Sequence, residues 1–494
     1  MGGGNVRGQP RRIRQVPSRP ERCARPIRSL RMTTLARYRM AFYGDDFTGS
    51  TDALEVLAFA GYRCALFLAP PSPETLERFP DLDVVGIAGD SRAMSPGEMD
   101  LHLPEVFRSL AKLGAPLVHY KVCSTFDSSP TIGSIGKVIE LSRGAFSGAP
   151  VPIVAGTPAL GRYCLFGNLF ARFGTDGDVF RIDRHPIMSV HPVTPMAEAD
   201  LALHISQQAP LRIEKILFPS YEASRGATDV DVKAVLDAQP DAILFDAGTP
   251  QHLTEIGRHL ERQALDSRPL FVVGSSGVEY ALTQWWRARE GAPQSDQKYE
   301  HFAPVDRVLA VSGSASKLTA LQIHAAIQAG FIDMPVDARA LVDDAQWPAA
   351  HTDISERAIA LLNQGRSVIL HTARGADDPR IGAMIDALTA RGFSHHAAKH
   401  TGGRILGERL GQVVRSILAR APIKRLLLSG GDTSSQVTKV LRPDALEIAA
   451  RLAPGAPLCR ALSRSNAMNG LEIALKGGQM GGEHFFERGK LGNA

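Results

Sequence analysis

Cysteine is sparse in this chain of 494 residues, which contains five of them. Cys23, Cys64, Cys123, Cys164 and Cys459 are widely separated, and no two of them form a CxxC pair. An odd, scattered set of this kind argues against a disulfide framework and against a structural zinc site. The cysteine content therefore fits a reducing compartment, and we expect a cytoplasmic protein.

Long apolar runs and standard nucleotide motifs are also absent. No apolar stretch approaches the ~20 residues of a membrane span, and no secretory signal core is present. The chain contains neither GxxxxGK[ST] nor GxGxxG. The sequence thus predicts no membrane association, and no standard fingerprint identifies a nucleotide site.

A net positive charge is confined to the first 39 residues. That segment holds eleven arginines and one acid, Glu21. Because the whole chain has a formal charge of +5, residues 40–494 carry a net charge of −5. A mildly acidic body with no helix-turn-helix motif and no basic recognition surface predicts no binding to nucleic acid.

Segment 1–39 is rich in Arg, Gly and Pro and poor in apolar residues, which predicts a disordered tail. We interpret it as an over-extended translation start, with Met32 or Met40 as the real beginning. An Arg-rich, acid-poor start is also typical of an organelle transit peptide, and this alternative stays open.

The length exceeds the roughly 250–300 residues that one hydrophobic core usually covers. Apolar runs, small-residue turns and helical patterns alternate along the chain. This pattern predicts an α/β fold with two domains, each a largely parallel sheet flanked by helices. A polar stretch marks the boundary, so we expect an N-terminal domain over 40–290, a linker over 291–304 and a C-terminal domain over 305–494.

A glycine turn is the central motif of the C-terminal domain. Segment 425–441 (RLLLSGGDTSSQVTKVL) reads as a buried strand, a turn of small residues and a helix capped by Thr433, Ser434 or Ser435. Free N–H groups at a helix N-terminus, next to glycines without Cβ atoms, suit a phosphate. Such turns also occur in any α/β sheet. Near the chain end, Lys476 stands beside further glycines and can neutralise phosphate charge.

Polar residues follow several predicted strands of the N-terminal domain. Asp45 and Asp46 lie at the carboxyl end of the first strand, where open α/β sheets bind ligands. A carboxylate there can hold a hydroxyl or accept its proton, although either aspartate can instead cap the following helix. Arg92 follows a later strand and can clamp a carboxylate in a bidentate way, although a surface salt bridge is the commoner role of an arginine. Lys121 lies within the predicted strand 117–122.

Eight segments, in order, resemble the four-carbon acid sugar kinase family, and together they cover about residues 40–486. They are YGDDFTGSTDA, GDSRA, YKVCST, HPVTPM, VVGSSGVEYAL, VSGSASKLT, LSGGDTSSQV and LKGGQMGG. The resemblance implies an N-terminal domain that binds a sugar acid and a C-terminal domain that binds ATP. Phosphoryl transfer would take place in the cleft between them.

The resemblance also implies roles for single residues. Asp45 and Asp46 would be catalytic, and the substrate would face Arg92, Lys121, Ser124 and Thr125. Residues that we expect to hold ATP come from three loops: Ser312, Ser314, Gly430, Gly431, Asp432, Thr433, Lys476 and Gly478. Mg²⁺ is inferred to accompany ATP, and the sequence identifies no ligands for it.

One motif departs from the family pattern. Many members read K-x-D-S-T-L-R-G where segment 121–128 reads KVCSTFDS, so that Cys123 replaces an acid and Asp127 replaces an arginine. The charge of the expected sugar pocket is therefore changed, and the substrate stays open among threonate, erythronate, 3-oxo-tetronate and a branched relative such as 3-oxoisoapionate.

We therefore expect an ATP-dependent kinase, a phosphotransferase that acts on a terminal hydroxyl of a small acid sugar. Two alternatives stay open: a two-lobed regulator that binds a sugar acid without chemistry, and an ATP-independent aldolase or epimerase. The expected partners are the sugar acid and ATP, and homo-oligomerisation is left open.

Overall fold

Short runs of aliphatic residues form the N-terminal strands of the central sheet, and most of their side chains are buried on both faces. These strands are parallel and lie in the order β2-β3-β1-β4-β11-β5-β10-β9. Their bounds are β1 Met40–Gly44, β2 Cys64–Phe67, β3 Val84–Ala88, β4 Leu117–Lys121, β5 Val151–Val154, β9 Ile213–Ile216, β10 Ala242–Phe245 and β11 Leu270–Gly274.

The C-terminal half repeats this arrangement with parallel strands in the order β13-β14-β12-β15-β18, followed by the antiparallel strands β17 and β16. Their bounds are β12 Leu309–Ser312, β13 Ile332–Pro335, β14 Val368–His371, β15 Arg425–Ser429, β16 Ala445–Ala453, β17 Ala456–Leu462 and β18 Glu472–Lys476.

The two halves join edge to edge, because β16 pairs with β2 through Ala445↔Phe67 and Leu446↔Leu66. The described residues therefore contain one 15-stranded sheet that crosses both halves. The predicted two-domain α/β class with largely parallel strands is confirmed. The sequence did not indicate that one continuous sheet would join the two domains. A separate antiparallel sheet contains β6 Arg162–Leu165, β7 Asn168–Arg172 and β8 Val179–Arg181.

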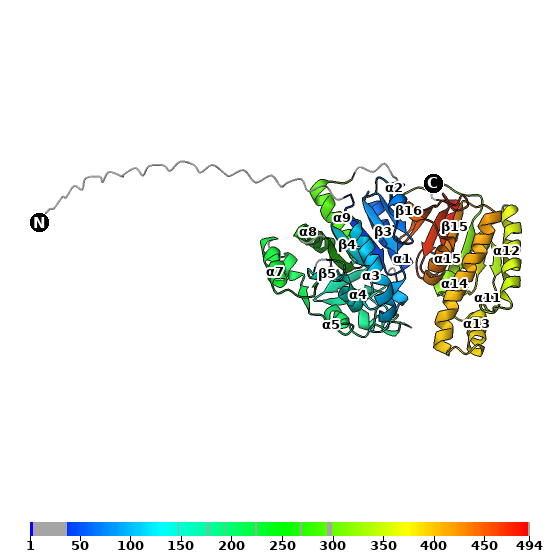
Figure 1. The fold of residues 1–494 in the computed structure, drawn as a ribbon, viewed down its shortest axis with the longest axis horizontal. Helices are drawn as coiled ribbons and strands as arrows, with labels where there is room; N and C mark the ends of the chain where they lie inside the picture. Colours follow the sequence, from blue (N-terminus) through cyan, green and yellow to red (C-terminus); the bar gives the residue numbers. More distant parts are fainter. Residues whose placement is uncertain are drawn as a thin grey trace. The chain divides into compact units, whose positions relative to one another are not determined.

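Helices cover the strands, with α3 and α4 lying over the N-terminal half and α14 and α15 over the C-terminal half (Figure 1). In the N-terminal half the helices are α1 Phe47–Phe59, α2 Pro73–Glu77, α3 Pro96–Lys112, α4 Ile135–Ser142, α5 Leu201–Ser206, α6 Pro219–Glu222, α7 Arg225–Asp237, α8 Pro250–Asp266 and α9 Gly277–Glu290. In the C-terminal half they are α10 Lys317–Gln328, α11 Ala338–Val342, α12 Trp347–Asn363, α13 Pro379–Ala390, α14 His395–Arg420, α15 Gly431–Leu441 and α16 Phe485–Leu491.

The strand order reverses once in each half. From β1 the chain passes to β2 on one side, whereas from β4 it passes to β5 on the other side, so the switch point lies between the carboxyl ends of β1 and β4. In the C-terminal half the chain leaves β12 and β15 in opposite directions in the same way. Open α/β sheets bind ligands at such switch points, so the topology marks two candidate positions.

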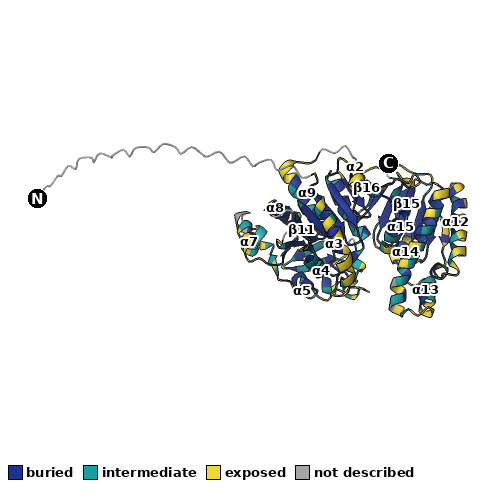
Figure 2. Cartoon of the chain, in the orientation of Figure 1, coloured by how far each residue is buried: buried dark blue, intermediate teal, exposed yellow. Residues whose placement is uncertain are grey.

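The interior is apolar and continuous across the two halves. One layer of buried side chains includes Leu54 and Val272 from the N-terminal half and Leu309 and Leu446 from the C-terminal half. Figure 2 shows the strands buried and the exposed residues gathered on outer helices such as α12 and α13. The common layer and the β2–β16 pairing together fix the halves as one compact unit, Ala36–Ala494.

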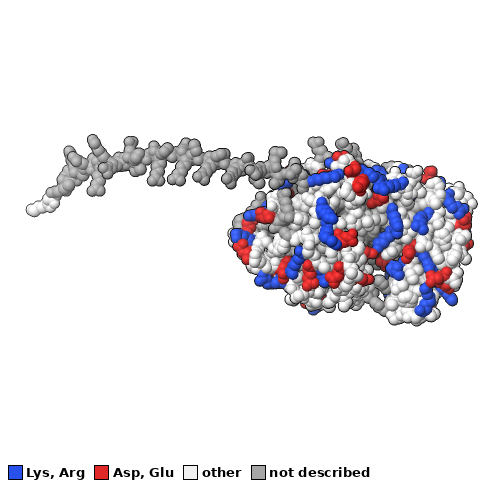
Figure 3. Space-filling model, viewed as in Figure 1, with Lys and Arg blue, Asp and Glu red and all other residues white. Residues whose placement is uncertain are grey.

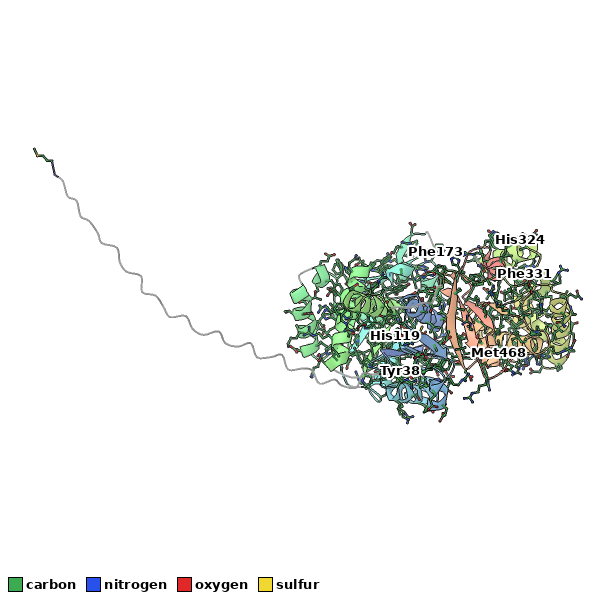
Figure 4. The ribbon with its side chains drawn as sticks, turned by 90° about the horizontal axis from the view of Figure 1, so that it is seen from above. Tyr38, His119, Phe173, His324, Phe331 and Met468 are labelled. Atoms are coloured by element: carbon green, nitrogen blue, oxygen red, sulfur yellow. The ribbon has the colours of Figure 1, made fainter. Side chains whose placement is uncertain are left out.

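The structure, a computed structural model, describes residues 1–2, 37–146, 148–174, 177–191, 193–222, 225–266, 269–293 and 299–492. Most of the predicted tail, residues 3–36, lies outside this description. At the end of the predicted tail, Tyr38 is 2% exposed and Arg39 donates its backbone N–H to the Asp83 carbonyl. Figure 4 labels Tyr38 beside the strands of the body.

The predicted linker over 291–304 also has ordered contacts. Residues 294–298 lie outside the description, but Tyr299 is buried and its ring lies 5.2 Å from that of Phe59. Its carbonyl accepts the backbone N–H of Arg451 at 2.8 Å. The connection between the halves is therefore packed onto both of them.

On the face shown in Figure 3, acidic and basic side chains are interspersed over both halves. Among the described residues, no helix is long and apolar enough to cross a membrane.

Candidate active site

Arg92 holds two aspartates together at the carboxyl end of β1. Its Nε and Nη2 atoms donate to the Asp45 carboxylate at 3.1 and 2.6 Å. Its Nη1 and Nη2 atoms donate to the Asp46 carboxylate, both at 2.9 Å. The structure thus brings together three residues that the sequence predicted for the site, but the Arg92 guanidinium faces the protein's own carboxylates.

The two aspartates differ in their surroundings. Asp46 is the N-cap of α1, because its carboxylate accepts the backbone N–H of Gly49 at 2.7 Å and the Thr48 hydroxyl at 2.8 Å. Burial acts to raise its pKa, but Arg92, Lys121 and these hydrogen bonds outweigh burial and lower it. Burial raises the pKa of Asp45 to about 6, assisted by Asp46 and opposed by Arg92.

Lys121 ends β4 beside these aspartates and is buried. Its Nζ atom donates to the Val122 carbonyl at 3.0 Å and lies 3.3 Å from the Asp52 carboxylate of α1. Burial alone would lower its pKa, but Asp52 and Glu279 outweigh burial and raise it. The Lys121 ammonium is therefore charged, and it is partly neutralised by the protein itself.

A fully buried pair lies behind Lys121. His119, two residues earlier on β4, has its Nδ1 atom 2.6 Å from Glu279 Oε1 and its Nε2 atom 3.1 Å from the Gly274 carbonyl. Figure 4 shows His119 among the strands of the N-terminal half. Both ring nitrogens thus have partners, which holds β4 against β11 and α9 under the site.

The loop after Lys121 supplies hydroxyl groups. Ser124 is half-buried, whereas Thr125 is buried and donates its hydroxyl to Asp127 at 2.5 Å. Asp127 also accepts the hydroxyl of Thr194, from the predicted HPVTPM segment, at 3.4 Å. Asp127, which stands where the family pattern has an arginine, is thus stabilised by hydrogen bonds from two threonine hydroxyls.

In the C-terminal half, three loops meet at the carboxyl ends of β12, β15 and β18. The strand register places Ser312 opposite Ser429, and Ser429 opposite Lys476. Thr319 of α10 links the loops, because its hydroxyl lies 3.1 Å from both Ser314 Oγ and the Gly478 carbonyl. The predicted ATP residues from these three loops therefore form one cluster at the second switch point.

The glycines of this cluster allow the three loops to approach closely. A Cβ on Gly313 would lie 2.1 Å from Thr433 Oγ1, and one on Gly478 would lie 2.7 Å from Ser314 Oγ. Gly430 has φ of +107°, which side chains rarely adopt. At Gly431, by contrast, a Cβ would meet nothing within 4 Å, so the space above the first turn of α15 is open.

The N-terminus of α15 differs from the sequence prediction. Thr433, Ser434 or Ser435 was expected to cap this helix, but the helix begins earlier, at Gly431, and its N-cap is Gly430 without a side-chain bond. The positive φ of Gly430 turns the chain directly from strand to helix. Thr433 is consequently buried against the glycine loops, whereas Asp432 is exposed in the first turn.

Lys476 is the cation of the glycine cluster. It is buried, and its Nζ atom donates to the Gly477 carbonyl at 3.1 Å and to Thr319 Oγ1 at 3.3 Å. No carboxylate pairs with it among the described residues. Burial lowers its pKa to about 7, so an anion bound here would stabilise the charged form.

The two clusters are connected by an ion pair. Asp90, two residues before Arg92, pairs with Lys439 of α15. At 1.5 Å of rise per residue, Lys439 lies roughly 12 Å along the helix axis from Gly431.

Comparison with known proteins identifies the family. Residues 40–282 match the family profile of a sugar-binding N-terminal domain, and residues 309–486 match that of a nucleotide-binding C-terminal domain. A 3-oxo-isoapionate kinase of Paraburkholderia graminis is 44% identical over 458 residues, which cover 92% of this chain and 95% of that protein. The chain belongs to the four-carbon acid sugar kinase family.

This acid sugar kinase is thus a phosphotransferase with an alcohol group as acceptor. A 3-oxo-tetronate kinase of Cupriavidus necator is 26% identical over 444 residues, covering 90% of this chain and 94% of that protein. A solved structure of a Salmonella typhimurium protein aligns over 91% of this chain and 98% of its own with a TM-score of 0.71 and 23% identity, which shows a common fold.

The residues of this acid sugar kinase fit a phosphate ligand better than a metal held by protein alone. The described residues contain no group of three His, Cys, Asp or Glu side chains that could hold a metal ion. Mg²⁺ commonly takes one or two carboxylates together with substrate phosphates and water. Asp432, exposed in the first turn of α15, is the carboxylate in the glycine cluster that fits this role.

Three residues that contact the candidate clusters were not singled out from the sequence. Asp52 lies within the quoted YGDDFTGSTDA segment, one turn into α1, and Thr319 stands three residues after the N-cap Ser316 of α10. Helical spacing therefore offered a signal for both. Thr194 lies within the quoted HPVTPM segment, but its contact with Asp127 joins residues 67 positions apart and could not be read from the sequence.

A cavity of about 460 Å³ lies elsewhere on the kinase. It is lined by residues such as Arg143, Val151 and Asp241, at the amino ends of β5 and β10. Ligands of α/β sheets bind at the opposite, carboxyl ends, so we place the site at the polar clusters and not at this cavity.

Proposed function

We propose that the protein is an ATP-dependent kinase that phosphorylates a terminal hydroxyl of 3-oxo-isoapionate, a branched acid sugar. One observation carries the proposal: each half has a polar cluster at its own switch point, one rich in carboxylates and cations and the other in glycine. The name of the relative that is 44% identical supports the choice of substrate.

The glycine cluster is the proposed ATP site. Ser312, Ser314, Gly478 and the first turn of α15 would surround the phosphates, with Lys476 supplying positive charge and Asp432 a ligand for Mg²⁺. When bound, Mg²⁺–ATP supplies the γ-phosphoryl group. The open space above Gly431 supports this position, because a phosphate needs close approach to the helix N–H groups.

The carboxylate cluster is the proposed acid sugar site. Lys121, Ser124 and Thr125 would contact the substrate, and Arg92 would act as a positioning residue that orients the aspartates. We assign the proton acceptor to Asp45. Its pKa of about 6 suits a base near neutral pH, whereas Asp46 is engaged as a helix cap.

In the proposed reaction, Asp45 accepts the proton of the terminal hydroxyl while that oxygen forms a bond to the γ-phosphorus. The bond from the γ-phosphorus to the β–γ bridging oxygen breaks, and ADP leaves. Lys121 and Lys476 neutralise charge on either side of the transferred group. Phosphoryl transfer depends mainly on such positioning and charge neutralisation.

Coupled ADP release would test the proposal. Purified protein with Mg²⁺–ATP should form ADP with 3-oxo-isoapionate at least tenfold faster than with 3-oxo-tetronate, threonate or erythronate. ADP formed faster with a four-carbon acid would move the substrate assignment to that acid. No ADP with any acid, together with no ATP-induced thermal shift, would contradict the kinase and favour the binding regulator.

A further inference from the structure

The cations of the acid site are already engaged by the protein. Arg92 donates through Nε, Nη1 and Nη2 to Asp45 and Asp46, and Lys121 lies against Asp52. Asp127 adds a further carboxylate in the adjoining loop. Carboxylates therefore outnumber these two cations, and the substrate's own carboxylate requires another positive group.

Arg162 is a cation close to this site that has no acid partner among the described residues. It begins β6, after the loop that follows β5, so it lies at the same carboxyl edge of the sheet as the loop after β4. Its Nη1 atom donates to the carbonyls of Leu160 and Arg172 at 2.9 and 3.3 Å, which fixes the guanidinium in place. Its Nε atom is enclosed without a hydrogen-bond partner.

The environment of Arg162 favours an anion. Burial lowers its pKa, and the nearby Arg172 acts in the same direction. The Cys123 thiol is close enough to interact electrostatically with the guanidinium. Burial and Asp127 raise the pKa of that thiol, so Cys123 is neutral and supplies no counter-charge. Arg162 is half-buried, and its charge is met by carbonyl groups alone, so a bound carboxylate would offset the free energy that its desolvation costs.

We propose that Arg162 binds the carboxylate of the acid sugar, in the space next to the loop that carries Cys123. The proposal rests on the proposed function for the substrate class, and it leaves Asp45 and Lys121 to act on the hydroxyl end. Arg162 is then the residue that selects acids over neutral sugars, and Cys123 leaves its guanidinium available.

Binding measured without ATP tests this role separately from phosphoryl transfer. Calorimetric titration with 3-oxo-isoapionate should give a Kd about a hundredfold higher for Arg162→Met than for wild type, since a charge-assisted pair is lost. Arg172→Met, which removes a neighbouring arginine, is the matched control and should change the Kd less than threefold. The KM for ATP should stay unchanged in both variants.

A second pair of variants leaves Arg162 in place. Cys123→Asp would supply a carboxylate beside the guanidinium and should weaken acid binding at least tenfold, whereas Cys123→Ser should have little effect. Wild type should also prefer the acid over its primary amide, and Arg162→Met should lose that preference. A merely structural role would not change the ratio of acid to amide binding.

The outcomes separate the two proposals. If wild type phosphorylates the acid and Arg162→Met binds it as tightly as wild type, the Arg162 proposal is overturned and the kinase stands. If wild type binds the acid, Arg162→Met does not, and no ADP forms, the kinase fails and Arg162 stands. If wild type binds neither 3-oxo-isoapionate nor threonate, both are overturned for this substrate class.

Discussion

Asp45 and Asp46 are neighbours in the sequence, but a conservative substitution should separate their roles. Asp45→Asn removes the proposed proton acceptor and should lower kcat about 10²- to 10⁴-fold. Asp46→Asn keeps an oxygen that can accept the Gly49 N–H and should lower kcat less than tenfold. Steady-state kinetics of the two variants, with melting temperatures as a folding control, would measure this difference.

Asp46→Ala completes this comparison, because alanine cannot cap α1. It should lower the free energy of unfolding by about 0.5–2 kcal/mol, as measured by urea titration. A larger loss of kcat in Asp46→Asn than in Asp45→Asn would reverse the assignment of the base.

Lys476 should make catalysis depend on pH. Its pKa of about 7 means that the ammonium loses its charge as the pH rises through neutrality, so kcat/KM for Mg²⁺–ATP should fall about tenfold between pH 7 and pH 8.5. On the acidic side, kcat/KM should fall below pH 6, where Asp45 becomes protonated. In Lys476→Arg the side chain stays charged, so kcat/KM should not fall between pH 7 and pH 8.5.

The same shift has a consequence for stability. The pKa of Lys476 is lower in the folded state, at about 7, than its ordinary value of 10.5. The unfolded state therefore binds more protons between these values, and Lys476 favours folding less as the pH falls toward 7. Lys476→Met should weaken this dependence in urea titrations at pH 7 and pH 9. If neither kcat/KM nor the free energy of unfolding changes with pH differently in wild type and in the Lys476 variants, the lysine is charged over the whole pH range.

At the scale of the element, a substitution in the first turn of α15 should weaken ATP binding without lowering stability. The Cβ introduced by Gly431→Ala would lie within 4 Å of no other atom. Alanine also stabilises a helix relative to glycine by up to about 1 kcal/mol. The variant should therefore be at least as stable as wild type. Its methyl group would occupy the approach of a phosphate, so the KM for ATP should rise at least tenfold in the ADP assay.

Gly382→Ala is the matched control, because Gly382 lies within α13 and a Cβ there also meets nothing within 4 Å. It should gain similar stability without a change in KM. If Gly431→Ala binds ATP like wild type, the phosphates do not lie over the first turn of α15.

Local sequence predicted the elements that carry the site. The apolar run before Ser429 and the glycines after it indicated a strand, a turn and a helix, and the carboxyl ends of successive strands indicated where polar residues gather. The N-cap of α15 was mispredicted because capping preferences favour Thr433, whereas the positive φ of Gly430 begins the helix earlier. Backbone conformation at one glycine outweighed side-chain preference.

Contacts between distant segments were beyond local reasoning. Arg92 was expected to face the substrate, since an arginine past a strand gives no sign that Asp45 and Asp46, 47 and 46 positions away, take its N–H groups. The β2–β16 pairing likewise depends on strands from different halves. Such features follow from topology, which the sequence pattern did not specify.

At the scale of the whole molecule, the Asp90–Lys439 ion pair joins the two halves near both clusters. The pair is partly exposed, so its loss should change the free energy of unfolding by less than about 1 kcal/mol. If it positions the α15 N-terminus relative to Arg92, Lys439→Gln should nevertheless lower kcat about three- to tenfold. Raising the salt concentration from about 0.05 to about 0.5 M shortens the Debye length roughly threefold and should reduce the difference from wild type.

Charge exchange provides the decisive comparison for this pair. The double variant Asp90→Lys with Lys439→Asp should recover most of the kcat that either single reversal loses, because the attraction is restored with opposite signs. Arg78→Gln removes a different ion pair between the halves, Arg78–Asp444 at 2.7 Å, and should leave kcat unchanged. If the Asp90–Lys439 and Arg78–Asp444 pairs affect kcat equally, both act by holding the two halves together and neither has a specific role at the site. If the exchanged pair recovers nothing, Asp90 and Lys439 act separately and the coupling between the two clusters passes through the continuous sheet.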